Sequence, residues 1–170
     1  EYISKHLINM VSVPFPNTGG NKNSNLKKEL NSENSGFVPP QNIQAEESVL
    51  GGILLDPDAI GRIADIIKPE AFYIGAHKEI YRTALMLHSQ GKPTDLTSMS
   101  AWLADNGTLE KIGGNNKLVE LVENVSSTAS IEQVASLISD KFLRRQLIKS
   151  GNEVVQLGFD QSQPTEEVLD

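Results

Sequence analysis

Few side chains in this 170-residue sequence could do chemistry, and their spacing does not predict a catalytic site. The histidines are His6, His77 and His88, and no two of them form a His-x-x-x-His pair that would place two metal ligands on one helix face. The sequence has no cysteine, which excludes disulfides, thiolate zinc sites and thiol nucleophiles. We therefore expect no metal site, and we interpret His77 as a residue near a helix start that bonds neighbouring backbone.

The adjacent acids and the adjacent glycines are better explained by helix structure than by a catalytic carboxylate pair or a phosphate-binding loop. Glu46 and Glu47 are adjacent acids, and adjacent residues on a helix point apart. We place both in a first helical turn, where the helix dipole favours negative charge. The glycine pairs at 51–52 and 113–114 lack the Lys-Ser/Thr end of a phosphate-binding loop. The sequence thus predicts no catalytic residue, no nucleotide site and no cofactor site in this chain.

One basic run, formed by Lys141, Arg144, Arg145 and Lys149, is a candidate contact for nucleic acid or an acidic partner. The alternative is a solvated helix face whose charges pair with acids elsewhere. The formal net charge of −7 argues against non-specific DNA binding, because phosphate contacts need clustered lysine and arginine.

The elements that must position these residues are predicted to be helices, so the fold class is all-α. From Val38 onward, apolar residues recur at helical spacing, and no alternating strand pattern is convincing. Asn42, Asp56 and Asp95 are expected helix caps, and the glycines at 51–52 suggest a second helix passing close by. We expect Met99, Trp102 and Leu103 to point inward. The expected helices cover residues 42–55, 57–67, 77–90, 96–106, 116–123 and 130–157, with a short turn at 70–72 and a further helix from 165.

The first 37 residues are expected to form a disordered leader. The segment 17–36 is rich in Asn, Gly, Ser and Lys, so it cannot bury enough apolar surface to offset its ordering entropy. No apolar run is long enough to span a membrane, and the start is not a good signal peptide.

A series of short motifs from Val38 to Asp170 resembles the N-terminal domain of the DnaB-type replicative DNA helicase of bacteria and plastids. No single motif is specific, but their order and spacing together carry the resemblance. The matching pieces are Pro39-Pro40-Gln41-Asn42-Ile43-Gln44-Ala45-Glu46, Leu50-Gly51-Gly52, Phe72, His77, Ile80-Tyr81, Gly91-Lys92-Pro93-Thr94-Asp95, Leu109, Ile112-Gly113-Gly114 and Leu143-Arg144-Arg145-Gln146-Leu147-Ile148.

The resemblance implies a compact globular head over residues 38–125 and a helical hairpin over 126–170. The second hairpin helix would be truncated here, and the linker and ATPase domain that follow it in such helicases would be absent. In the family, heads and hairpins pair between subunits into a collar of the hexameric ring, which binds the C-terminal domain of primase. ATP and Mg²⁺ would be cofactors of the parent helicase, and the motor would make most contacts with DNA. Because the motor would be absent, this chain would have no helicase or ATPase activity alone. The resemblance also implies a location in the bacterial cytoplasm or the plastid stroma, and no membrane partner is expected.

By the same resemblance, the end of the long helix would share the primase contact through Leu147, Ile148, Val154 and Val155. We place these residues on one apolar stripe that begins at Val134 and includes Leu137. Lys117 occupies a place where family members usually carry an aromatic residue, so primase affinity or the partner surface would differ in this protein. Two alternatives stay open: a stand-alone helical nucleic-acid-binding module that uses the basic run, and the helicase-binding domain of a primase.

Overall fold

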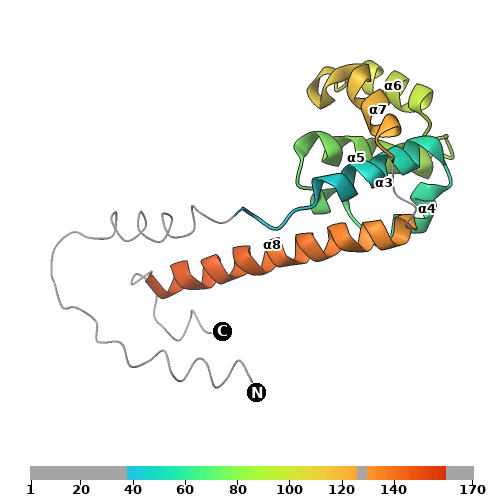
Figure 1. Cartoon of the computed structure of the whole chain (residues 1–170). Coiled ribbons are helices and arrows are strands. Elements are labelled where there is room, and N and C mark those ends of the chain that lie inside the picture. The colour runs from blue at the N-terminus through green and yellow to red at the C-terminus, as the bar shows by residue number, and fades with distance from the viewer. Residues whose placement is uncertain (1–37, 126–129, 160–170) are drawn as a thin grey trace, which may run out of the picture. The chain divides into compact units, whose positions relative to one another are not determined.

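The computed structural model describes residues 38–125 and 130–159, and every regular element within these ranges is helical. The all-α prediction is therefore confirmed. The expected leader at 1–37 and the expected helix from Thr165 lie outside the described residues. The elements, shown in Figure 1, are α3 (Ile43–Leu55), α4 (Ala59–Ile63), η2 (Pro69–Ala71), α5 (Gly75–Ser89), α6 (Leu96–Asp105), η3 (Glu110–Ile112), α7 (Gly114–Glu123) and α8 (Ile131–Phe159).

Helix α3 is the element on which the others pack. It begins after Asn42, whose Oδ1 accepts a hydrogen bond from the Ala45 N–H at 3.0 Å, as the cap prediction required. Helices α5, α7 and α8 all contact α3. Both glycines of α3 lie where a neighbour comes close. A Cβ at Gly51 would clash with the Leu121 carbonyl oxygen on α7, and one at Gly52 would lie 3.2 Å from Cδ1 of Ile131 on α8.

The core lies between α3 and the helices around it. Tyr81 is fully buried, and its hydroxyl donates to the Ile67 carbonyl oxygen at 3.1 Å. Burial raises the pKa of Tyr81 to about 12, because the phenolate would lose its hydration. The Phe72 ring packs against Tyr81 with 4.9 Å between the ring centroids. The other large, fully buried side chains are Leu50, Ile53, Ile60, Ile63, Ile67, Ile80, Leu87, Met99, Leu103 and Leu118.

Two local predictions about the helices need correction. The second helix is only Ala59–Ile63, far shorter than the expected 57–67. Asp56 does not cap it directly, since its Oδ1 accepts the Asp58 N–H at 3.1 Å, ahead of the helix. Trp102 points inward as expected and packs against the core, but it is only half-buried, with the Lys92 ammonium 5.2 Å from its ring centroid. The Asp95 cap is confirmed, because its carboxylate accepts the N–H groups of Thr97 and Ser98.

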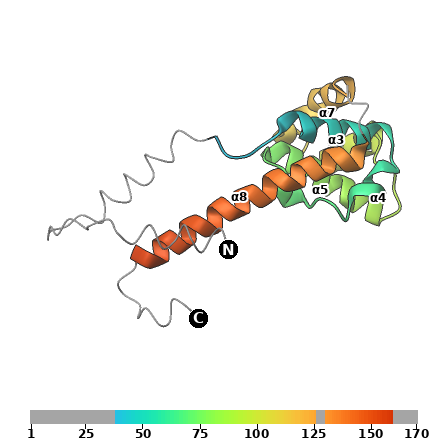
Figure 2. The same ribbon diagram turned by 60° about the horizontal axis from the view of Figure 1, so that its bottom comes forward.

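Helix α8 packs on the head helices (α3 to α7) only through its first half. Val134, Ala135 and Ile138 are buried there, whereas every residue from 146 to 159 is exposed. Figures 1 and 2 both show α8 continuing past the head helices, and we call residues 146–159 distal α8. Gly151 and Gly158 both lie within α8. A helix can absorb the cost of about 1 kcal/mol that one glycine carries.

Candidate functional site

Distal α8 exposes large apolar side chains without a cover in the described parts of the chain. Leu147 and Val154 are 72 % and 68 % exposed, and Ile148 and Val155 are 50 % and 44 % exposed. The four residues predicted for a partner contact are therefore accessible on one helical segment. Contiguous apolar side chains at a surface mark an interaction site, because monomeric proteins rarely leave large apolar patches in water.

Leu147 and Val154 do not continue the side of α8 that packs on the head, and Ile148 and Val155 lie on a flank between the two sides. At 3.6 residues per turn, Lys149 and Gln156 follow Ile138 on the head-facing side, three and five turns later. Leu143, Leu147 and Val154 share the opposite side, and Leu143 is also exposed. The expectation that Val134 and these residues share one apolar stripe, interrupted by Gly151, is therefore wrong. Leu137, which that stripe included, is 51 % exposed.

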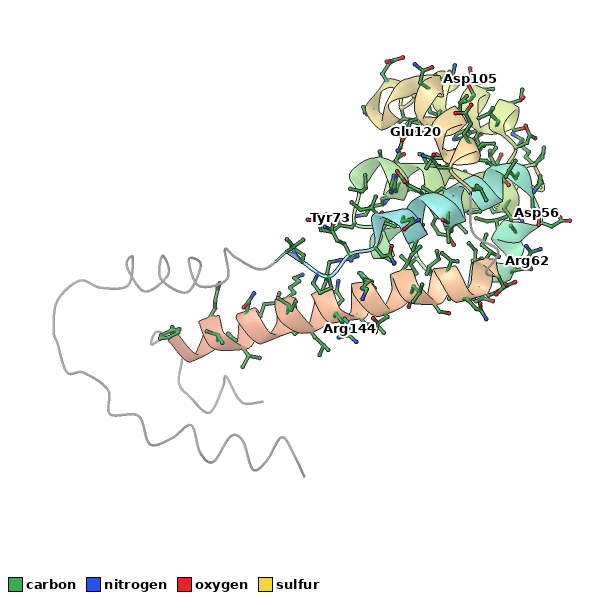
Figure 3. The ribbon with its side chains drawn as sticks, viewed as in Figure 1. Asp56, Arg62, Tyr73, Asp105, Glu120 and Arg144 are labelled. Carbon is green, nitrogen blue, oxygen red and sulfur yellow. The ribbon has the colours of Figure 1, made fainter. Side chains whose placement is uncertain are left out.

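Three residues of the basic run pair with acids on their own helix. Arg144 Nε lies 2.9 Å from Asp140 Oδ2, and Lys141 Nζ lies 3.8 Å from the same oxygen. The hydrogen bond from Arg144 lowers the pKa of the Asp140 carboxyl. Lys149 Nζ lies 3.7 Å from Glu153 Oε1. All three cations remain partly or largely exposed, with Arg144 on the side of α8 turned away from the head in Figure 3.

Arg145, the fourth residue of that run, faces the head instead. Its Nη1 donates to the Pro40 carbonyl oxygen at 2.7 Å, and its Nη2 donates to the Ala71 carbonyl oxygen at 2.6 Å. The guanidinium also lies 5.6 Å from the ring centroid of Tyr73 and 5.8 Å from that of Phe142. Sequence reasoning missed this role, because both carbonyls belong to segments far away in the chain. Two bonds to carbonyls and the nearby aromatic rings suit the planar guanidinium group.

A buried Glu46–His77 pair holds the backbone at residues 73–74, next to the Ala71 carbonyl that Arg145 binds. Sequence reasoning also missed this pair. Glu46 lies in the first turn of α3, as predicted, but its carboxylate is buried; the interpretation of His77 as bonding neighbouring backbone is wrong. Both side chains are almost fully buried, with His77 Nδ1 2.9 Å from Glu46 Oε2. The Glu46 carboxylate also accepts the N–H groups of Tyr73 at 2.6 Å and Ile74 at 3.4 Å. The partners are 31 residues apart, so no local pattern signals the pair.

Lys117 lies on α7, away from distal α8, and bridges two acids. Its Nζ is 3.0 Å from Glu47 Oε1 on α3 and 3.2 Å from Glu120 Oε1 on its own helix. Burial disfavours the charged form, but the hydrogen bonds to Glu47 and Glu120 outweigh it and raise the pKa of Lys117. Glu120, the second acid of this bridge, is labelled in Figure 3. The Lys117–Glu47 ion pair thus connects α7 to α3. Of the two adjacent acids, Glu47 therefore pairs with Lys117, whereas Glu46 pairs with His77.

Two further kinds of site are not seen in the described residues. Across 38–125 and 130–159, no group of three His, Asp or Glu side chains is arranged to hold a metal ion. In the same ranges, no helix combines the length and apolar character needed to cross a membrane.

Similar proteins were found among both sequences and structures. The replicative DNA helicase DnaB of Nostoc is 53 % identical over 147 residues, which are 85 % of this chain but 17 % of the relative. The Synechocystis DnaB helicase is 51 % identical over 78 % of this chain and 15 % of its own length. The chain therefore spans less than a fifth of these two relatives.

Solved structures agree with the sequence comparison. The N-terminal domain of the DnaB helicase from Mycobacterium tuberculosis superposes with a TM-score of 0.72 at 38 % identity, covering 78 % of this chain and 94 % of that one. A DnaB-like replicative helicase described with its interactions with primase superposes with a TM-score of 0.63 at 31 % identity, over 75 % of this chain and 30 % of that one. The family model "DnaB-like helicase N terminal domain" matches residues 38–140, more than half of the sequence. The chain belongs to the DnaB-like helicase N-terminal domain family.

Proposed function

We propose that this chain is the collar part of a replicative helicase and that distal α8 mediates subunit association and primase binding. The observation that carries the proposal is the exposed apolar side of distal α8, which has no cover in the described residues. Family membership gives this surface a context, since one structural relative is described with its interactions with primase. Burying such a surface against a partner is the ordinary source of binding free energy.

The remaining activities belong, in this proposal, to parts of the helicase that the chain does not contain. The chain covers a small fraction of its longer relatives. Its sequence carries no phosphate-binding loop. ATP and Mg²⁺ would be used by the motor domain of the hexamer, which would also make most of the DNA contacts. A cytoplasmic location of this chain is part of the same proposal.

The proposal is tested with Ile148→Asp in the complete helicase. A buried, unpaired carboxylate disfavours association, so we expect weaker capture of the primase C-terminal domain and fewer hexamers by mass photometry. Gln156→Glu is the matched control, because it adds the same charge on the head-facing side of exposed distal α8. Ile148→Asp binding equal to that of Gln156→Glu, with equal thermal melts, would remove Ile148 from the interface. A collapsed melt would show that Ile148 is a core residue of the hairpin instead.

Nucleic-acid binding by the basic run has weaker support. Lys141, Arg144 and Lys149 each have an acidic neighbour on α8, and Arg145 is bonded to backbone. A salt titration of oligonucleotide binding separates the two functions, because affinity through phosphate contacts falls steeply with salt. Binding to primase through apolar side chains would depend much less on salt.

A further inference from the structure

Arg145 lies at the point where α8 leaves the head. Before it, Ile138 is buried and Phe142 is packed against the core. After it, all described residues of α8 are exposed. The side chain of Arg145 therefore makes the last contact that can orient distal α8 relative to the head.

The two acceptors of Arg145 come from separate segments of the head. The Pro40 carbonyl belongs to the segment that leads into α3, and the Ala71 carbonyl ends η2. A guanidinium that bridges two backbone oxygens at 2.7 and 2.6 Å restricts both the tilt and the rotation of the helix that carries it. A single ammonium could not reproduce this planar fork.

The loop that receives Arg145 is itself held from inside the head. Residues 71–74 present the Ala71 carbonyl to Arg145, while the N–H groups of Tyr73 and Ile74 donate to the Glu46 carboxylate. Glu46 is in turn fixed by the buried His77. The acceptor for Arg145 is thus part of a rigid network that reaches α3 and α5.

We propose that Arg145 is a positioning residue that sets the direction of distal α8, and through it the placement of the partner surface. This inference rests on the proposed function for what the surface binds, but the direction of the helix can be measured without any partner. The adjacent Arg144 is the natural comparison, since it points away from the head and, among the described residues, bonds only to Asp140 on its own helix.

The test measures the distance between the head and distal α8 by pulsed electron paramagnetic resonance. Because the sequence has no cysteine, Ala104→Cys on α6 and Gln156→Cys on α8 would give two unique label sites, both exposed. Gln156 lies about 16 Å along the helix from Arg145, so a tilt of about 20° would move it by about 6 Å.

We expect a narrow distance distribution in the doubly labelled chain and in its Arg144→Ala variant. Arg145→Ala should shift or broaden the distribution by about that 6 Å, with the thermal melt of the head retained, and Arg145→Lys should lie between the two. An unchanged distribution in Arg145→Ala would overturn the inference, as would an equal change in Arg144→Ala. If Arg145→Ala does not fold, Arg145→Lys decides by the same criterion. If Ile148→Asp reduces or keeps primase capture without changing the 104–156 label distance, that result concerns the proposed function and not the role of Arg145.

Discussion

The close crossing of α3 and α7 predicts an unusual cost for the smallest possible substitution, Gly51→Ala. In an ordinary helix this change stabilises by about 1 kcal/mol, because alanine has the higher helix propensity. Here the added Cβ would clash with the carbonyl oxygen of Leu121 and with Cγ2 of Val125, and would lie 3.0 Å from the carbonyl carbon of Leu121. Since most of these atoms are backbone, the two helices would have to move apart.

The magnitude follows from the balance of these two effects. Overpacking a well-packed site costs about 1–3 kcal/mol, and a backbone clash places Gly51 at the upper end of that range. Subtracting the gain in propensity leaves an expected net loss of about 2 kcal/mol in the free energy of unfolding. Urea denaturation followed by circular dichroism at 222 nm measures this loss directly.

Two other glycines supply matched controls for Gly51. A Cβ at Gly52 would lie 3.2 Å from the end of the flexible Ile131 side chain, so Gly52→Ala should change stability by less than about 1 kcal/mol. A Cβ at Gly61 would lie 3.5 Å from His88 Cε1, which is an ordinary contact, so Gly61→Ala should be neutral or stabilising. A Gly51→Ala protein as stable as Gly61→Ala would refute the close crossing.

Two further predictions concern α6. Trp102→Ala should lower the free energy of unfolding by about 1–3 kcal/mol, less than the roughly 3–5 kcal/mol expected for a fully buried ring, because Trp102 is half-buried. Urea denaturation measures this loss, and a loss under about 0.5 kcal/mol would place the ring at the surface. The hydrogen bond from the Ser98 N–H lowers the pKa of Asp95 below its unfolded value, so its stabilisation is present above about pH 4 and lost as the pH falls through the folded pKa. Asp95→Asn keeps a capping side chain that does not titrate, so the variant and the unchanged protein should have equal free energies of unfolding at about pH 7 and diverge below about pH 4. Parallel curves of unfolding free energy against pH would contradict the lowered pKa of Asp95.

Local features of the fold were predictable because their causes are local. Asn42 and Asp95 cap the helices that follow them, and all three capping bonds join residues two or three apart. The glycines at 51–52 marked a close approach, since glycine inside a helix needs a compensating reason. The end of α4 was not predictable in this way, because an apolar run such as residues 59–67 can be buried as a short helix and a turn equally well.

The network around the candidate site was not predictable because its partners are distant in sequence. Glu46 and His77 are 31 residues apart, and Arg145 reaches carbonyls 105 and 74 residues before it. Backbone carbonyls carry no signal of residue type, so no sequence pattern could have singled out Pro40 or Ala71 as acceptors. Only the tertiary arrangement separates Arg145 from Arg144, which precedes it and has the same charge.

Helix α8 shows how one helix can serve two surfaces. On its head-facing side, apolar Val134 and Ile138 give way to polar Lys149 and Gln156 once the helix has passed the head. Its apolar character then continues on the opposite side, where Leu147 is most exposed. A helix that only covered a core would keep one apolar side along its whole length. Under the proposed function, this exposed apolar side contacts a partner rather than the head.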